Sequence, residues 1–182
     1  MVARKSGEAA TDALSLLRED HARVVDLFDQ FEQMKNDVDE QEKDALVARI
    51  CGELIVHTAI EEEIFYPEAR EALGEDPLFD EATVEHASAK DLIAQLGEME
   101  PDDELYDAKV TVLGEYVKHH IREEESEMLA RLADAGIDLD DLGRRLDERK
   151  TELMDEIGLD DLEALLPQGA NAHSSESQAP LR

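Results

Sequence analysis

Apolar side chains recur every three or four residues in four successive segments, and this period constrains the fold more than any other feature of the sequence. The stripes run through residues 14–31, 46–64, 79–96 and 106–128. Each stripe marks one face of a helix turned towards a core. The stretches between them are short, so consecutive helices are expected to run antiparallel. The pattern therefore predicts an all-α fold, an up-down-up-down antiparallel four-helix bundle.

Helix-capping residues and prolines punctuate these segments. Asp39 with Glu42 fits a capping box, and Asp76 followed by Pro77 fits the first two positions of a helix. Pro67 lacks an N–H group and clashes with the preceding turn, so it is expected to end or kink the second helix.

An additional C-terminal amphipathic helix is expected after Gly136. Its apolar side consists of Leu139, Leu142, Leu146, Leu153 and Ile157, and its basic side of Arg144, Arg145, Arg149 and Lys150. We expect the basic side to pair with carboxylates of the bundle; binding of a partner protein is the alternative. The predicted organisation is a flexible N-terminus (1–10), a four-helix bundle (11–133), a C-terminal helical extension (134–166) and a disordered tail (167–182).

The chain has 182 residues, enough for one domain, and a formal net charge of -30 from 48 acidic and 18 basic residues. This charge repels phosphate backbones and anionic lipid, so neither nucleic acid nor a membrane surface is an expected partner. The single cysteine, Cys51, allows no intrachain disulfide and is expected to be a small buried residue. Because the sequence has no signal-peptide pattern and no run of apolar residues long enough to span a membrane, a cytoplasmic location is expected.

Potential metal ligands interrupt every apolar stripe near its middle. The first stripe passes through His21, the second through His57 and Glu61, the third through His86, and the fourth through His120 and Glu124. The chain therefore repeats itself as two helical hairpins, each of which supplies a histidine and then an H-x-x-x-E pair. In such a pair the two side chains lie one turn apart on the same helix face. Since both hairpins turn at similar distances from these residues, all six side chains are expected at one level of the interior.

A lone core histidine is more often a hydrogen-bonded packing residue than a metal ligand. Two buried carboxylates are costly, however, and the sequence offers no matching set of buried lysines or arginines. Divalent cations supply the missing charge, so the six residues predict a metal site. His119 forms a rival H-x-x-x-E pair with Glu123, but it lies off the stripe by about 100° and is expected at the surface or outside the ligand set. Glu62 and Glu125 are expected to be exposed.

The segments LREDHARVVDLF, HTAIEEEIFYP, VEHASAK and HHIREEESEML resemble the motifs of the hemerythrin-like, HHE cation-binding domain, over residues 11–133. The resemblance implies two iron ions in an oxo- or hydroxo-bridged centre. His21, His57, His86 and His120 would then be terminal ligands, and Glu61 and Glu124 would bridge the irons. Imidazole and carboxylate ligands by themselves suit iron, manganese or zinc. The choice of iron therefore depends on the resemblance.

Two positions differ from those of the oxygen-carrying hemerythrins. Lys90 replaces a second histidine of the third helix, and Ala130 stands where the first hairpin has Pro67. The missing histidine is expected to leave one iron with a water or an open position, unless Lys90 lies near the site and holds an anion or peroxide.

These differences favour reactivity or sensing over simple oxygen carriage. We expect a non-haem di-iron protein that binds or reacts with O₂, peroxide or nitric oxide. The alternatives are an iron buffer without catalysis and a metal-free acidic helical interaction protein.

Overall fold

A computed structural model describes residues 11–158 of the chain, and all of these belong to helices or to the turns between them. The predicted flexible N-terminus (1–10), the predicted disordered tail (167–182) and the last residues of the predicted extension lie outside the described residues. Within residues 11–158, no helix is both long enough and apolar enough to cross a membrane.

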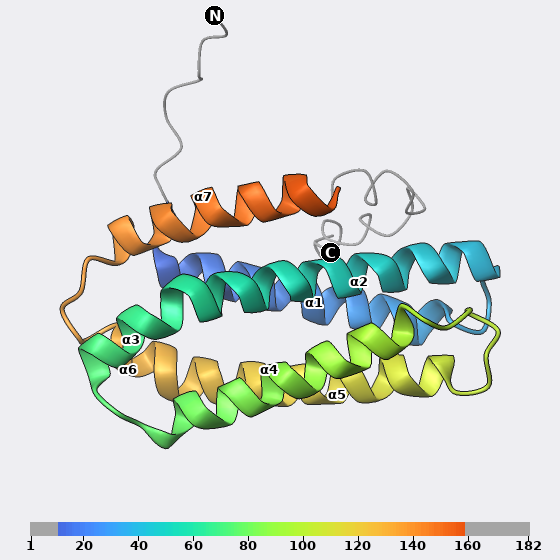
Figure 1. The fold of residues 1–182 in the computed structure, drawn as a ribbon, viewed down its shortest axis with the longest axis horizontal. Coiled ribbons are helices and arrows are strands. Elements are labelled where there is room, and N and C mark those ends of the chain that lie inside the picture. The colour runs from blue at the N-terminus through green and yellow to red at the C-terminus, as the bar shows by residue number, and fades with distance from the viewer. Residues whose placement is uncertain (1–10, 159–182) are drawn as a thin grey trace, which may run out of the picture.

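Four long helices form the predicted bundle: α1 (Ala13–Met34), α2 (Glu40–Ile60), α4 (Pro77–Leu96) and α5 (Tyr106–Glu123). Helices α1 and α2 form one antiparallel hairpin, and α4 and α5 form the other (Figure 1). The hairpins pack through α1 against α5 and α2 against α4, so each helix contacts two others around a square. This arrangement confirms the predicted fold class.

The helices begin at the predicted capping residues. Asp39 Oδ1 accepts a hydrogen bond from the Glu42 backbone N–H at 2.9 Å, and Asp76 Oδ1 accepts one from Leu78 N–H at 3.1 Å. Each aspartate thus satisfies a backbone donor that the first helical turn leaves without a partner.

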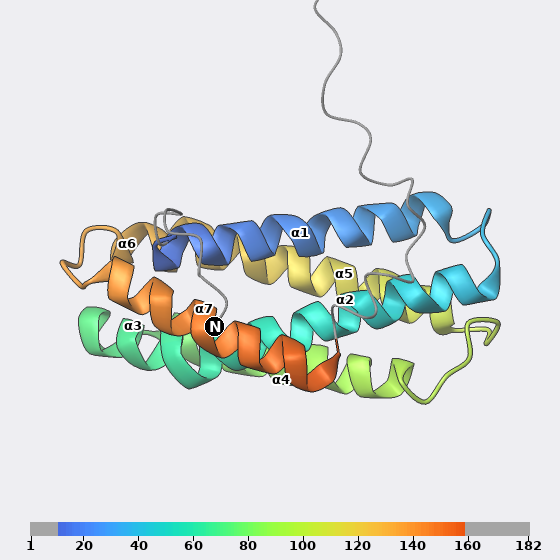
Figure 2. The ribbon, with the colours of Figure 1, turned by 90° about the horizontal axis from the view of Figure 1, so that it is seen from above.

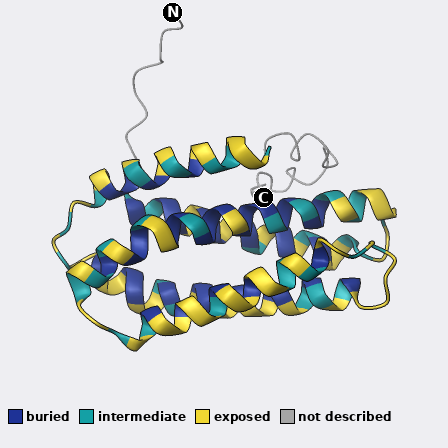
Figure 3. Ribbon diagram, viewed as in Figure 1, coloured by how far each residue is buried: buried dark blue, intermediate teal, exposed yellow. Residues whose placement is uncertain are grey.

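Buried residues lie on the helix faces turned into the bundle (Figure 3). The buried apolar residues form two clusters, one towards each end of the bundle. Leu17, Phe65 and Leu129 belong to one cluster, and Phe28 and Leu113 belong to the other. Cys51 packs against the second cluster, and burial raises the pKa of its thiol to about 12, so the thiol stays protonated at neutral pH. Between the two clusters lies a layer of buried polar side chains.

A π-helical segment follows the α-helix in the second helix of each hairpin. The first, η1 (Glu61–Phe65), continues into α3 (Tyr66–Leu73), and the second, η2 (Glu124–Leu129), continues into α6 (Ala130–Leu132). The helix therefore does not end at Pro67, because the wider π turn precedes the proline and the Tyr66 N–H bonds back to the Glu61 carbonyl. The second π segment forms without a proline, so proline is not what creates it. Each π segment begins at the glutamate of an H-x-x-x-E pair.

The fifth helix, α7 (Leu139–Ile157), lies across α1 and α2 on the outside of the bundle (Figures 1 and 2). Leu142 and Leu146 are buried, whereas Ile157 is 39% exposed, which corrects its predicted place on the apolar side. At Gly143, α7 lies close to the backbone at the start of α1. An added Cβ would lie 2.7 Å from the backbone nitrogen of Ala13.

The basic side of α7 pairs with the bundle as expected, with one exception. Arg145 contacts Glu68 at 2.6 Å, Arg149 contacts Glu63 at 2.7 Å, and Lys150 contacts Asp20. Arg144 pairs instead with Asp141 and Glu148 of its own helix. Three cations of α7 therefore hold the helix on α1 and on the segment that follows α2.

Candidate metal centre

The six predicted ligands come together in the polar layer at the middle of the bundle. Their exposed fractions lie between 0 and 8%, and the six are His21, His57, Glu61, His86, His120 and Glu124. The four histidines come from the four long helices, one from each, and the two glutamates open the two π segments. π segments inside helices are often found at functional sites.

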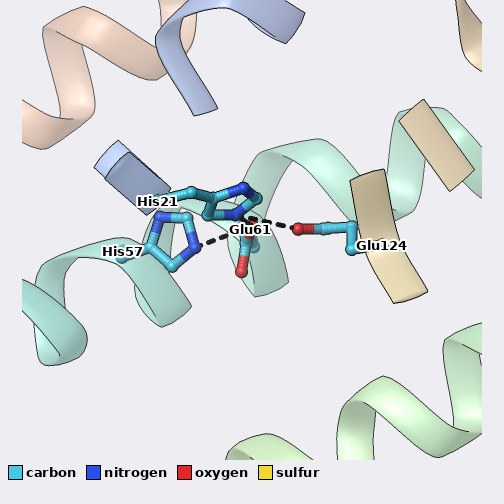
Figure 4. Close-up of side chains that lie close together, drawn as sticks. All are labelled: His21, His57, Glu61 and Glu124. Atoms are coloured by element: carbon cyan, nitrogen blue, oxygen red, sulfur yellow. Dashed lines mark ion pairs between the residues drawn. The ribbon is translucent and has the colours of Figure 1, made fainter. Parts of the chain in front are cut away.

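One half of the centre contains His21, His57, Glu61 and Glu124, each of which offers an atom within 4.8 Å of the others. His57 Nε2 lies 3.1 Å from Glu61 Oε1, and His21 Nε2 lies 3.1 Å from Glu124 Oε2. Figure 4 shows the two imidazole rings turned towards the two carboxylates. This half can surround one metal ion with two nitrogens and two carboxylate groups.

The other half contains His86, His120 and again Glu61. His86 Nε2 lies 3.3 Å from Glu61 Oε2 and 3.2 Å from His120 Nε2. Glu61 therefore turns one oxygen to each half, which is the arrangement of a bridging carboxylate. Glu124 lies with the first half, so a bridging role for Glu124 stays a prediction.

Carboxylates hold the outer ring nitrogens of three histidines. The Nδ1–H groups of His21, His86 and His120 donate to Glu125 at 2.9 Å, Glu62 at 3.1 Å and Glu85 at 2.8 Å. Such partners fix the tautomer and leave the Nε2 lone pair free to bind a metal. Glu62 and Glu125 were predicted to be exposed, and their side chains are 39% and 37% exposed, so for Glu125 the prediction holds only in part. The sequence analysis missed their contacts with the histidines. The sequence did contain a sign of this role, because Glu62 and Glu125 each directly follow a predicted bridging glutamate.

The fourth histidine, His57, faces Asp20 in the same manner but at a longer distance. His57 Nδ1 lies 3.9 Å from Asp20 Oδ2, and Lys150 of α7 contacts the other oxygen of Asp20. Asp20 is only 3% exposed, and burial alone would raise the pKa of its carboxyl group. The pKa is nevertheless lowered, because His57 and Lys150 stabilise the charged form. The C-terminal helix thus reaches the centre through Lys150 and Asp20.

Tyr66 adds a hydroxyl group that the sequence analysis did not anticipate. Its side chain is 5% exposed, and its oxygen lies 3.4 Å from His86 Nε2, 3.5 Å from His120 Nε2 and 3.5 Å from Glu61 Oε2. Burial and the charges of Glu124 and Glu61 raise the pKa of Tyr66 well above its usual value. At the equivalent position of the second hairpin stands Leu129. The phenol therefore lies beside His86 and His120 and faces the carboxylates of Glu61 and Glu124.

Two other polar residues singled out in the sequence lie outside the centre. The Lys90 ammonium group contacts both oxygens of Glu62 at 2.6 and 2.7 Å, and its side chain is 44% exposed. Lys90 thus binds Glu62, the carboxylate that accepts the hydrogen bond from His86. This corrects the alternative in which Lys90 holds an anion at the site. His119 is 54% exposed and lies 3.3 Å from Glu123, on the surface as expected.

The donor atoms fit metal ions in number, spacing and chemistry. Within the described part of the chain, buried atoms of His21, His57, Glu61 and Glu124 at the centre make no hydrogen bond. Metal–ligand bonds of about 2.1 Å place neighbouring ligand atoms about 3 Å apart, which matches the separations of 3.1–3.3 Å in both halves. Imidazole nitrogens and carboxylate oxygens are ligands of divalent transition metals.

Electrostatics also favour a cation at this position. Burial by itself lowers the pKa of His21, but the adjoining carboxylates of Glu124 and Glu61 raise it to about 11. Burial likewise lowers the pKa of His57, and Glu61 and Asp20 raise it to about 9. The centre thus stabilises positive charge, which protons provide when no metal is present.

An apolar cavity of about 30 Å³ adjoins the histidines. Its apolar lining includes Val24, Leu54, Ala89, Val117 and Ile121. All four histidines of the centre also line it. A cavity needs about 10–15 Å³ of such volume to hold one water molecule. The cavity therefore has room for one small molecule beside the centre.

Known proteins share this architecture and part of this sequence. A crystal structure of a hemerythrin HHE cation binding domain-containing protein from Mycobacterium kansasii has a TM-score of 0.68 and 22% identity, and the match covers 89% of this chain and 96% of that one. A DNA nickase of Nostoc sp. (strain PCC 7120) is 30% identical over 120 residues, which is 64% of this chain and 32% of that protein. The chain therefore spans about a third of the length of this curated relative.

The structural likeness, at 22% identity, shows a common fold. The family comparison shows which family the chain belongs to. The model of the hemerythrin HHE cation binding domain matches residues 12–132, the part of the chain that contains both hairpins and all six clustered side chains. The protein therefore belongs to the hemerythrin HHE cation-binding family.

Proposed function

We propose that the protein is a non-haem di-iron protein that binds or reacts with O₂, peroxide or nitric oxide. His21, His57, Glu61 and Glu124 hold one iron, and His86, His120 and Glu61 hold the other. Iron is the cation that this family typically binds. When bound, the metal pair supplies redox chemistry, whereas the protein holds the ligands in place and keeps bulk water away.

One observation carries the proposal. The Nδ1–H groups of His86 and His120 both donate to outer carboxylates, so both Nε2 atoms point into the centre. These two atoms lie only 3.2 Å apart in a buried site. A proton or a metal ion can lie between them, and the site favours such a cation, because the carboxylates of Glu85, Glu124 and Glu61 outweigh burial and raise the pKa of His120. The adjoining apolar cavity supports a small, uncharged or weakly polar reactant.

Tyr66 supports reactivity over simple carriage of oxygen. Its hydroxyl group lies at the half of the centre where Lys90 replaces a histidine, so it can serve as the missing ligand or as a proton donor. Either role distinguishes this centre from one in which histidines complete the ligand set.

A nucleic-acid function is not part of the proposal. The DNA nickase is about three times as long as the region it shares with this chain. A net charge of -30 also opposes close approach to a phosphate backbone. The matched length of 120 residues is close to that of the cation-binding domain, which spans residues 12–132 of this chain.

The test is metal content and absorption after anaerobic loading with ferrous iron, followed by exposure to air, peroxide or nitric oxide. We expect two irons per chain and a spectrum that changes with the added reactant. His57→Leu should lose iron while keeping its helical circular dichroism, and Glu71→Gln, an exposed carboxylate, should behave as the wild type. Iron without turnover would favour an iron buffer, and a chain that binds no metal would overturn the proposal.

A further inference from the structure

A second group of ligand-type side chains lies on the surface beside the buried centre. It consists of Glu85 from α4 and of His119 and Glu123 from α5, and each offers an atom within 4.8 Å of the others. His119 Nε2 lies 3.3 Å from Glu123 Oε1 and 3.9 Å from Glu85 Oε1. The exposed fractions are 28% for Glu85, 39% for Glu123 and 54% for His119. One imidazole and two carboxylates are a ligand set for a divalent transition metal.

This surface group leads directly to the buried centre. A cavity of about 10 Å³ is lined by Glu81, Glu85 and Glu123 on its outer side and by His120 and Glu124 on its inner side. Glu85 takes part in both places, because its Oε1 faces His119 and its Oε2 accepts the hydrogen bond from His120 Nδ1 at 2.8 Å. Leu78, Ala82 and Met128 complete the lining, so the cavity is a short, partly apolar path with carboxylates on its outer side and at its inner end.

The equivalent path in the other hairpin is closed. Asp20 corresponds to Glu85 in the repeat, but it is 3% exposed and is covered by Lys150 of α7. Val56 and Ile60 stand where the second hairpin has His119 and Glu123, and both are buried. Of the two hairpins in residues 11–158, the α4–α5 hairpin is thus the one that combines exposed ligand-type side chains with a small cavity leading inwards.

We propose that Glu85, His119 and Glu123 form a surface site for a divalent transition-metal ion and deliver that ion to the buried centre. The delivery role rests on the function proposed above, whereas the surface site itself does not. His119 gives the site preference for transition metals over Mg²⁺, which carboxylates and water bind well without imidazole. The ion then passes between Glu85 and Glu123 to Glu124.

The first test is Zn²⁺ binding by equilibrium dialysis in excess Mg²⁺, which occupies sites made of carboxylates alone. We compare the wild type with H119Q/E123Q and with E115Q, which removes the same formal charge from an exposed position of the same helix. The double variant should lose one site or bind it about tenfold or more weakly, and E115Q should match the wild type. Because the comparison is a difference between variants, it reports the surface site whether or not the buried centre is filled. Equal binding by all three proteins would overturn the proposal.

The second test is the rate at which metal-free protein takes up ferrous iron anaerobically, measured as iron protected from a chromogenic chelator. H119Q/E123Q should fill several-fold more slowly than the wild type and E115Q, yet reach the same final iron content, because the buried ligands are intact. Equal rates would overturn the delivery role. If the wild type itself takes up no iron, the proposed di-iron function fails, and the Zn²⁺ comparison still decides the surface site.

Discussion

The residues of the centre fall into two groups. One group faces the proposed metal positions, and the other holds the first group in place by hydrogen bonds. Glu61 turns one oxygen to each half, and the histidines point their Nε2 atoms inwards because carboxylates hold their outer nitrogens. Mutation of such outer partners typically lowers metal affinity or activity about 10- to 100-fold. We therefore expect the partly exposed glutamates at the edge of the centre to affect metal binding.

Glu125 provides the clearest test of this support. Glu125→Ala removes the acceptor for His21 Nδ1–H, so the ring loses its fixed tautomer and orientation. We expect iron affinity at this half to fall about 10- to 100-fold, measured by competition with a chelator. Glu127→Ala, an exposed glutamate of the same π segment, is the control. Equal affinities in the two variants would show that Glu125 does not orient His21.

Tyr66 is expected to act on one half of the centre. Tyr66→Phe removes only the hydroxyl group near His86 and His120, so the variant should keep its fold but change the visible spectrum of the ferric protein and the affinity for one of two irons. Tyr106→Phe, a buried phenol whose hydroxyl contacts Asp44, is the control. An unchanged spectrum and stoichiometry in Tyr66→Phe would exclude a role at the metals.

Metal loading should depend on pH through the histidines. In the metal-free protein the pKa of His21 is about 11 and that of His57 about 9, so both rings are protonated at neutral pH. A metal must displace these protons, and affinity should therefore rise as the pH increases from 6 towards 9. Calorimetry in buffers of different ionisation enthalpy should show release of about one to two protons per chain. Binding without proton release would contradict this assignment.

The two hairpins differ in what covers them. Both hairpins have a π segment that begins at the clustered glutamate, but only the first is covered by α7. That helix closes the Asp20 side with Lys150, while the Glu85 side stays open. The C-terminal helix, which lies beyond the family match, therefore distinguishes two otherwise similar halves.

The contact between Lys150 and Asp20 is expected to stabilise the fold. Lys150→Met leaves the buried Asp20 carboxylate without its main partner, at a cost of about 3 kcal/mol in the free energy of unfolding, measured by urea denaturation. Adding Asp20→Asn should recover part of this loss, because the uncompensated charge is removed. Arg144→Met is the control, since Arg144 pairs only within α7 at the exposed surface. A Lys150 variant as stable as the Arg144 variant would show that the buried pair adds nothing.

At the scale of the whole molecule, the polar layer separates two apolar clusters and weakens the metal-free bundle at its middle. Buried carboxylates without full hydrogen bonding are costly, and a net charge of -30 adds repulsion across the surface. A cation that binds the folded chain should relieve both effects.

Iron should therefore raise the melting temperature. Free iron at 100 times its dissociation constant contributes about 2.7 kcal/mol, which corresponds to a rise of roughly 5–10 °C in a chain of this size. The measurement is anaerobic calorimetry with and without ferrous iron, and a chelator should reverse the shift. His57→Leu is the control and should show little or no shift. A melting temperature unaffected by iron would contradict a buried metal centre.

The sequence by itself determined the bundle and the clustered residues. The helical period of the apolar residues specified the four helices, and the short connections specified their antiparallel order. His21, His57, His86 and His120 interrupt those stripes at matching positions, so the period also placed them in one layer. Local pattern suffices here because a helix fixes which side chains share a face.

Only the tertiary structure decided which residues meet from different helices or across an altered turn. The π segments rotate the residues that follow Glu61 and so bring the Tyr66 hydroxyl to the centre, which regular α-helical spacing does not predict. Glu62, Glu85 and Glu125 reach histidines of other helices, and Lys150 reaches Asp20 from beyond the bundle. These contacts depend on the rotation and separation of packed helices, which a single helix period leaves undetermined.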